Sequence, residues 1–150
     1  MSETQTDPQA APEWAEAADN FVGEWNIRLD QCRFEVGEPP QDAVYRVVRD
    51  GGQLRLEAEA TVQTGQRAKQ VVVGVPDGQP QKYPVGAGAD SILLRFPDTR
   101  TLESEFRRGD QVVARARRQV SEDGRHLTVT QNGSTVEGRE FTNTAVYERA

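Results

Sequence analysis

Two residue types that carry much of protein chemistry are almost missing from this sequence. Cys32 is the only cysteine and His126 the only histidine, so the chain can form no internal disulfide and cannot supply the ligand set of a zinc site. No nucleophile elbow, phosphate-binding loop or pair of metal-binding carboxylates can be assembled from the other residues. We therefore expect no metal, no cofactor and no catalytic residue, and we expect Cys32 to be a buried free thiol.

Long apolar runs and an excess of positive charge are absent as well. The formal net charge is -6 and the isoelectric point about 4.9, and no basic run is interleaved with aromatic residues, which argues against nucleic acid as a partner. No stretch reaches the length of a membrane span. The N-terminal stretch MSETQTDPQAAPEW has no basic region followed by an apolar run, so the chain as written is expected to be cytoplasmic. A chain that had lost its leader would look the same, and it would be periplasmic or secreted.

What the sequence does contain fits one domain with a wet outer surface. Its 150 residues suffice for a single core without help from a metal or a disulfide. Hydrophobic residues make up 35 % and charged residues 28 %, with a mean hydropathy of -0.73, which suits a sheet with one solvated face better than a helical globule. Residues 1–12 are polar and without periodicity, which predicts a disordered arm before a domain over residues 13–150.

The domain begins with a short helical signal and continues with alternation of period two. In PEWAEAADNF, Pro12 and the acidic residues after it favour the start of a helix. From Phe21 to Leu29, apolar residues alternate with polar ones in the pattern of a half-buried strand. Similar runs follow at AVYRVV, QLRLEAEATV, AKQVVVGV, SILLRF, RTLESEFRR, QVVARARRQV, RHLTVTQ and FTNTAVYE. Turn residues separate most of them, at DGG, PDGQP, PDT, RGD, EDG and NGS.

Short strands joined mostly by tight turns form a meander, and closing such a sheet on itself protects both of its edges. We therefore predict an all-β protein, a single antiparallel up-and-down β-barrel of about 8–10 strands with a short N-terminal helix. A two-sheet sandwich remains the alternative, because hairpin spacing does not separate the two folds.

Several stretches resemble known barrel proteins. The string NFVGEWNI, a Phe-x-Gly-x-Trp pattern after a short helix, resembles the start of lipocalins and fatty-acid-binding proteins, the calycin barrels. In those families the glycine lets chain segments approach and the tryptophan plugs one end of the barrel, positions held here by Gly23 and Trp25. KYPVGAGAD, SEDGRHLTVTQNG and TNTAVYERA resemble a group of uncharacterised small bacterial lipocalin-like proteins. The resemblance runs from about Asn20 to Arg149 and implies a barrel with a pocket, without an established activity.

The resemblance to fatty-acid-binding proteins also implies how a pocket would hold a carboxylate. Those proteins use interior arginines and a tyrosine, two of them in an Arg-x-Tyr pair on the last strand. Here the tyrosine matches Tyr147, whereas Ala145 stands at the arginine position. The stretch RRQVSEDGR resembles the preceding turn of that family and places Arg118 near its other interior arginine, with one extra residue in the turn. The stretch DQCRFEVGEPPQDA, which is broken by glycine and proline, predicts a loop in place of the family's helical lid.

Strand phase independently selects side chains that face the interior. In QVVARARRQV, the phase of Val112 and Val120 points Arg118 inward, where an unpaired guanidinium is costly and needs a partner. A place at the solvated rim is the alternative for Arg118, and ordinary packed core is the alternative for Tyr147. The complete set of candidate ligand-binding residues is Arg118, Tyr147, Trp25, Gln131, Asn143 and Tyr45.

Small residues recur on the inward phase of several strands, at Ala58, Ala60, Ala114, Ala116 and Ala145. They either leave a cavity or fit the taper of a narrow barrel. We therefore predict a non-catalytic carrier or sensor, a monomer or weak dimer, that binds a small hydrophobic or carboxylate ligand inside the barrel. The alternatives are an interaction or envelope-associated module with a filled core, and an isomerase-type enzyme that uses interior polar groups.

Overall fold

The computed structural model describes residues 12–83, 89–135 and 137–150, so the arm expected over residues 1–12 and the turn in KYPVGAGAD lie almost wholly outside the described residues. Two short helical elements are present, the α-helix α1 (Ala15–Asp19) and the 3-10 helix η1 (Leu29–Gln31). The strands are β1 (Gly23–Ile27), β2 (Arg33–Phe34), β3 (Asp42–Asp50), β4 (Gln53–Thr61), β5 (Arg67–Gly74), β6 (Gln81–Lys82), β7 (Ser91–Asp98), β8 (Thr101–Arg108), β9 (Gln111–Val120), β10 (His126–Ser134) and β11 (Glu140–Arg149). All but β2 and β6 coincide with the alternating runs of the sequence.

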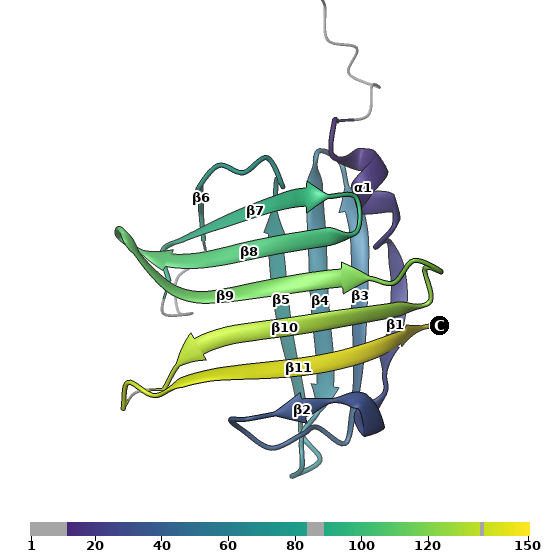
Figure 1. Cartoon of the computed structure of the whole chain (residues 1–150), viewed down its shortest axis with the longest axis vertical. Coiled ribbons are helices and arrows are strands. Elements are labelled where there is room, and N and C mark those ends of the chain that lie inside the picture. The colour runs from purple at the N-terminus through teal and green to yellow at the C-terminus, as the bar shows by residue number, and fades with distance from the viewer. Residues whose placement is uncertain (1–11, 84–88, 136) are drawn as a thin grey trace, which may run out of the picture.

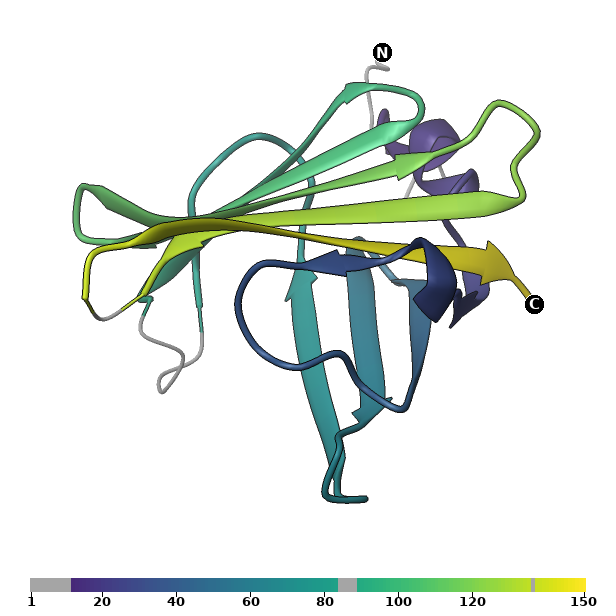
Figure 2. The same cartoon turned by 60° about the horizontal axis from the view of Figure 1, so that its bottom comes forward.

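The strands form one antiparallel sheet that curls into a nearly closed barrel. Their order is β5-β4-β3-β1-β11-β10-β9-β8-β7-β6, and β2 pairs with β11 beside β1. Figure 1 shows β7 to β11 crossing in front of β3 to β5, and Figure 2 shows the two groups meeting at a steep angle around the interior. Because β1 pairs with both β3 and β11, the two groups are one sheet. The predicted up-and-down barrel with a short N-terminal helix is confirmed, and the sandwich is excluded.

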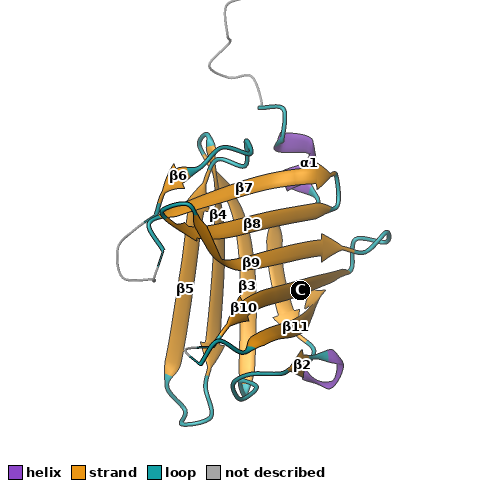
Figure 3. Ribbon diagram, turned by 60° about the vertical axis from the view of Figure 1, so that its left-hand side comes forward, coloured by secondary structure: helices purple, strands orange, loops and turns teal. Residues whose placement is uncertain are grey.

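A side chain joins the two ends of the sheet, where β5 and β6 share no backbone ladder. Gln81 accepts a hydrogen bond from the backbone N–H of Val75 at 2.7 Å and donates one to the carbonyl of the same residue. The glutamine amide thus takes the place of a peptide group in a ladder. Figure 3 shows β5 next to β6 at this seam, and no described strand pairs with the outer edge of β5.

Aromatic side chains close one end of the barrel, where α1 also lies (Figure 1). Phe21 and Trp25 have no exposed surface, and the indole Nε1 of Trp25 donates to the carbonyl of Phe21 at 2.9 Å. The helix buries its small residues at this end, Ala15, Ala17 and Ala18. Trp25 therefore occupies the place that the resemblance to calycin barrels implies, inside the end of the barrel.

Arg149, near the end of β11, fastens this closed end. Its guanidinium carbon lies 4.1 Å from the centre of the Trp25 ring, a cation–π contact. Its nitrogens donate to three backbone carbonyls at 2.9 Å each, those of Asn20, Val22 and Gly124. Gly23 has a φ of +134°, and a Cβ there would lie 2.8 Å from Nη1 of Arg149. The glycine is thus needed for the close approach of the arginine.

The turn predicted at NGS is wrong, because these residues continue β10 as far as Ser134. Gly133 pairs with Phe141 on β11, and the Phe141 ring lies so close that a Cβ on Gly133 would be 3.1 Å from its Cζ. The hairpin turns later, where Thr135 N–H donates to Arg139 O at 2.8 Å and Gly138 has a φ of +85°. Here the glycine in NGS accommodates an aromatic ring rather than a turn.

The alternation from Phe21 to Leu29 also ends earlier than predicted. Strand β1 stops at Ile27, and Leu29 lies in η1 with 40 % of its surface exposed. The chain leaves the sheet here through the hydrogen bond from Gln31 N–H to Arg28 O at 2.9 Å. Leu29 therefore does not share the buried face of Trp25.

The outer face of the sheet carries the paired charges that the composition predicts. Glu103 on β8 lies between Arg95 on β7 and Arg117 on β9, with N···O distances of 2.8 and 3.0 Å. The hydrogen bond from Arg95 holds the pKa of the Glu103 carboxyl below its ordinary value. These pairs stay on the solvated side, so they leave the interior to apolar side chains and a small number of polar ones.

Candidate functional site

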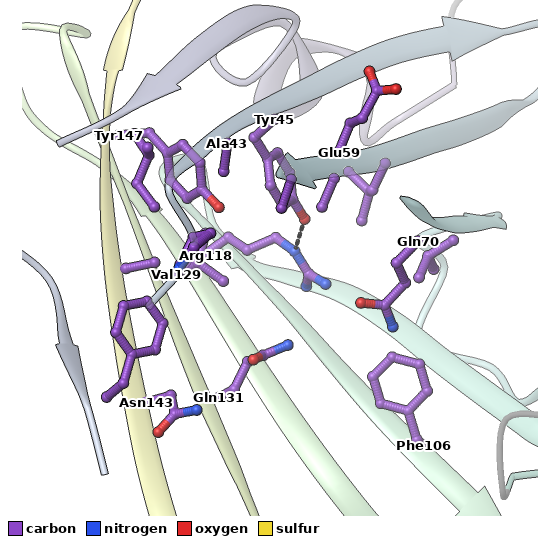
Figure 4. A pocket seen from close by; sticks show the side chains of 18 residues that line it. Ala43, Tyr45, Glu59, Gln70, Phe106, Arg118, Val129, Gln131, Asn143 and Tyr147 are labelled. Atoms are coloured by element: carbon purple, nitrogen blue, oxygen red, sulfur yellow. Dashed lines mark hydrogen bonds between the residues drawn. The ribbon is translucent and has the colours of Figure 1, made fainter. Parts of the chain in front are cut away.

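A cavity of about 180 Å³ lies inside the barrel, between β3, β4 and β5 on one wall and β8 to β11 on the other. Figure 4 shows side chains from both walls pointing into it. Larger apolar residues form much of its lining, namely Ile27, Phe34, Leu56, Val72, Phe106 and Val129. Alanines complete it at positions 43, 58, 60 and 145. Of the five alanines expected to point inward, Ala58, Ala60 and Ala145 border the cavity.

Arg118 reaches into this cavity from β9 and is 4 % exposed (Figure 4). Its neighbours Arg115 and Arg117 are exposed, whereas Ala116 and Val120 are buried, so the alternation of β9 places Arg118 inside. Nε donates to the Tyr45 hydroxyl at 2.6 Å. Nη1 donates to Oγ of Ser104 on β8 at 3.1 Å, so both hydrogen-bond partners of Arg118 are neutral hydroxyls.

The charge of Arg118 has no carboxylate partner among the described residues. None of their salt bridges includes Arg118, and their hydrogen bonds use its Nε and Nη1 but not its Nη2. Glu59 borders the cavity, but its carboxylate pairs with Arg46 at 3.1 Å and Arg67 at 3.2 Å on the outer face. Figure 4 accordingly shows the Glu59 carboxylate turned away from the guanidinium. The cavity therefore holds an interior cation that neutral hydroxyls alone stabilise.

Two tyrosines flank the guanidinium on the same side of the cavity. The rings of Tyr45 and Tyr147 pack with their centroids 5.5 Å apart and their planes tilted by 60°. The Tyr45 oxygen accepts from Arg118, so the hydroxyl proton of Tyr45 points elsewhere and can be donated. Burial raises the pKa of Tyr147 well above its ordinary value, which keeps the phenol neutral. No hydrogen bond between described residues uses the Tyr147 hydroxyl, so a second donor faces the cavity.

Asn143 holds the loop that covers one side of the cavity. Its Oδ1 accepts from the backbone N–H groups of Glu35 (2.8 Å) and Val36 (3.1 Å), and its Nδ2 donates to Val36 O at 3.0 Å. Strand β2, in the same loop, pairs with β11 and places Phe34 against the cavity, and Pro40 follows at its border. The prediction of a covering loop without a helical lid thus has a counterpart in residues 32–41. Asn143 borders the cavity, but its side-chain oxygen and nitrogen already form hydrogen bonds with this loop.

Two glutamines border the cavity from opposite walls. Gln131 lies on β10, next to Ala116 and Asn143 in the ladder, and Gln70 lies on β5 opposite Ala58. Both are exposed, so they lie where the cavity opens to solvent. Their amides enter no hydrogen bond between described residues.

The structure thus brings five of the six predicted residues to one cavity, Arg118, Tyr147, Tyr45, Gln131 and Asn143. Trp25 does not border it and lies in the closed end instead. Sequence reasoning missed Ser104 and Gln70. Ser104 had a usable signal, because it stands between Leu102 and Phe106 on the inward phase of its strand, where a hydroxyl needs a polar partner. Gln70 had a similar signal, because it stands two residues before Val72 on the inward phase of its strand, where an amide needs a polar partner.

The two scarce residues lie away from the cavity. Cys32 is half-buried, its Sγ lies 3.2 Å from the carbonyl oxygen of Arg28, and burial raises its pKa. His126 lies on the outer side of β10 with Nε2 3.7 Å from a carboxylate oxygen of Glu148. Within the described ranges, no group of three or more His, Cys, Asp or Glu side chains is placed to hold a metal ion. None of the described helices has the length and hydrophobicity to cross a membrane.

No protein-family model matches the sequence, and no curated protein matches it significantly. Solved structures do match. The zebrafish ileal bile acid-binding protein complexed with cholic acid aligns with a TM-score of 0.53 and 13 % identity, over 87 % of this chain and 99 % of its own. The extracellular fatty acid binding protein As-p18 aligns with a TM-score of 0.54 and 12 % identity, over 88 % of this chain and 97 % of its own. At these identities the likeness concerns the fold, and the chain has the β-barrel fold of these two proteins.

Proposed function

We propose that the protein is a non-catalytic carrier or sensor that binds a small carboxylic acid with a mostly apolar body inside its barrel. Arg118 is the observation that carries this proposal. It is 4 % exposed, contacts two hydroxyls and meets no carboxylate among the described residues. Removing a cation from water without a counter-charge costs several kcal/mol, so an anion that enters the cavity is favoured over a neutral molecule of the same shape.

The donors around Arg118 suit the head group of a carboxylate. The free Nη2 of Arg118 and the hydroxyl protons of Tyr45 and Tyr147 are three donors without acceptors among the described residues, and a carboxylate offers about four lone-pair sites. A charge-assisted contact of this kind is worth about 1.5–3 kcal/mol. The three donors come from β3, β9 and β11 of the same chain, so the site does not need a second copy of the protein.

The walls and the size of the cavity favour a short apolar body. Aliphatic and aromatic side chains line it, and its volume of about 180 Å³ is below the roughly 300–1,000 Å³ of sites for drug-sized ligands. The two solved structures of the same fold are described as binding proteins for a bile acid and for fatty acids, and cholic acid and fatty acids are carboxylic acids. The cavity also weighs against the alternative of an interaction module with a filled core.

Competition binding would test the proposal. A fluorescent apolar probe is displaced with decanoate and with decanol, which share a chain length and differ in charge. We expect decanoate to bind more tightly to the wild type, and Arg118→Met to weaken decanoate about ten- to a hundredfold while sparing decanol. Methionine keeps much of the apolar stem of arginine, so the variant removes chiefly the charge.

Arg115→Met is the matched control, because Arg115 lies on the outer side of the same strand and is exposed. It should leave both affinities unchanged. Equal affinities of wild type and Arg118→Met for both ligands would remove Arg118 from the site. Absence of saturable binding for every acid in a series of straight-chain acids, the short ones included, would refute the proposed function.

A further inference from the structure

Gln70 and Gln131 bring two side-chain amides to the cavity, and a plain fatty acid offers neither of them a hydrogen-bond partner along its chain. Both side chains lie on the inward phase of their strands, Gln70 two residues from buried Val72 and Gln131 two residues from buried Val129. Neither amide enters a hydrogen bond between described residues. Figure 4 shows them on opposite sides of the cavity, with the guanidinium of Arg118 between their strands.

A hydrocarbon chain that passes these two amides would strip water from them without replacing its hydrogen bonds. Burying an amide without a partner is unfavourable, whereas a ligand hydroxyl can accept from Nε2 and donate to Oε1 of the same side chain. Sites that contain such unpaired polar groups discriminate against analogues that lack the matching group. The apolar residues of the lining, such as Phe106 and Val129, still favour a carbon skeleton between the two polar ends of the ligand.

We propose that the ligand is a carboxylic acid that bears a second hydrogen-bonding group, a hydroxyl or an amide, several carbons from the carboxylate. This inference rests on the proposed function, because it takes the carboxylate to lie against Arg118 and the tyrosines. The second group lies against Gln70 and Gln131 where the cavity opens. Gln70 and Gln131 are then specificity-determining residues, and Arg118 determines the charge of the ligand.

The inference predicts a preference between matched acids. Decanoic acid is compared with a series of hydroxydecanoic acids that carry the hydroxyl at successive positions of the chain, and with 10-amino-10-oxodecanoic acid, whose amide lies at the far end from the carboxylate, each by calorimetry on the full chain. We expect at least one functionalised acid to bind the wild type about two- to tenfold more tightly than decanoate, the effect of one neutral hydrogen bond in a site shared with water. Plain decanoate that binds as tightly as every functionalised acid would overturn the inference.

Variants assign the preference to the two amides. Gln131→Leu and Gln70→Leu should abolish the preference for the functionalised acid while leaving decanoate as tight or tighter. Gln119→Leu is the control, because Gln119 is an exposed residue on the outer side of β9, and it should change nothing. A preference that survives both leucine variants would also overturn the inference.

Failure of this inference is distinguishable from failure of the proposed function. If decanoate binds and its affinity depends on Arg118, but a hydroxyl or amide group does not raise the affinity, then the proposed carboxylate site is supported and the proposed role of the glutamines is refuted. If no acid of either series binds, then the proposed function itself is refuted. Retained melting temperatures of the leucine variants would show that the change in binding does not come from unfolding.

Discussion

Arg149 and Arg118 enter the same barrel from two different strands and meet very different surroundings. Arg149 stacks on Trp25 and gives its nitrogens to three backbone carbonyls at the closed end. Arg118 is more deeply buried, yet its hydrogen bonds to the described part of the chain reach only two hydroxyls, and it borders a cavity. Each nitrogen of Arg149 donates to a carbonyl of the fold, whereas Nη2 of Arg118 has no acceptor among the described residues.

The difference separates a structural arginine from one available for binding. A guanidinium whose three nitrogens all donate to carbonyls fixes the chain segments that supply them, which here are the segment between α1 and β1 and the turn between β9 and β10. A guanidinium that retains a free donor beside a cavity gains from an anion that the chain does not supply. We therefore expect substitutions at the closed end to lower stability, and substitution of Arg118 to alter binding instead.

Loss of the Trp25 side chain should have the largest effect on stability. Trp25→Ala deletes a fully buried aromatic and removes the surface on which Arg149 stacks, at a cost of about 3–5 kcal/mol. Chemical denaturation with equilibrium analysis would measure this. Trp14→Ala is the control, since Trp14 packs against the core beside α1 but is only half-buried, so it should cost much less. An equal loss for both variants would mean that Trp25 is not the main aromatic of the closed end.

Arg149→Met should rank second. The variant keeps apolar contact with Trp25 but leaves the carbonyls of Asn20, Val22 and Gly124 without their donor, which we expect to cost about 2–3 kcal/mol because the site is only partly shielded from water. The melting temperature would then fall by roughly 4–12 °C for a chain of this size. Ligand affinity at Arg118 should be unchanged. A variant that melts like the wild type would show that these hydrogen bonds contribute little.

Gly23→Ala should cost less than the loss of Arg149, and the two changes should be coupled. The alanine would adopt a strained φ near +134° and place its Cβ 2.8 Å from Nη1 of Arg149, a combination we expect to cost on the order of 1–3 kcal/mol. In the background of Arg149→Met the collision disappears and only the backbone strain remains. A double-mutant cycle should therefore give a smaller effect of Gly23→Ala in that background. Strict additivity would contradict the close approach.

Alternation along the chain was sufficient to predict the long strands and the inward phase of Arg118 and Tyr147. It failed at NGS, because the same glycine serves a turn or the close approach of a ring, and only the partner Phe141 decides between them. It also left β2 and β6 unpredicted, since strands of two residues have no period to detect.

The contrast between the two arginines was harder to predict from the sequence. Arg149 shares the inward phase of Tyr147, so a phase argument can indicate both arginines. Whether each one is satisfied depends on groups far along the chain, carbonyls near residues 20–22 and 124 for Arg149 and the Tyr45 hydroxyl for Arg118. Such pairings follow from the closure of the sheet, which local patterns do not contain.

Arg118→Met should have the smallest effect on the stability of the empty protein, and the size of that effect is the sharpest test of the comparison. The wild-type cation is held by two neutral hydroxyls without a counter-charge, and replacing a poorly compensated interior charge by an apolar side chain of similar length is often neutral or stabilising. The loss of the two hydrogen bonds to Tyr45 and Ser104 opposes this gain, at about 1 kcal/mol per bond. We therefore expect a change within about 1 kcal/mol of zero without ligand, and a clear loss of the stabilisation that added decanoate gives to the wild type.

Thermal melts of both proteins with and without decanoate would measure the two effects together. A fall as large as that of Arg149→Met without ligand would show that Arg118 is saturated by the fold after all, and the distinction between the two arginines would be lost.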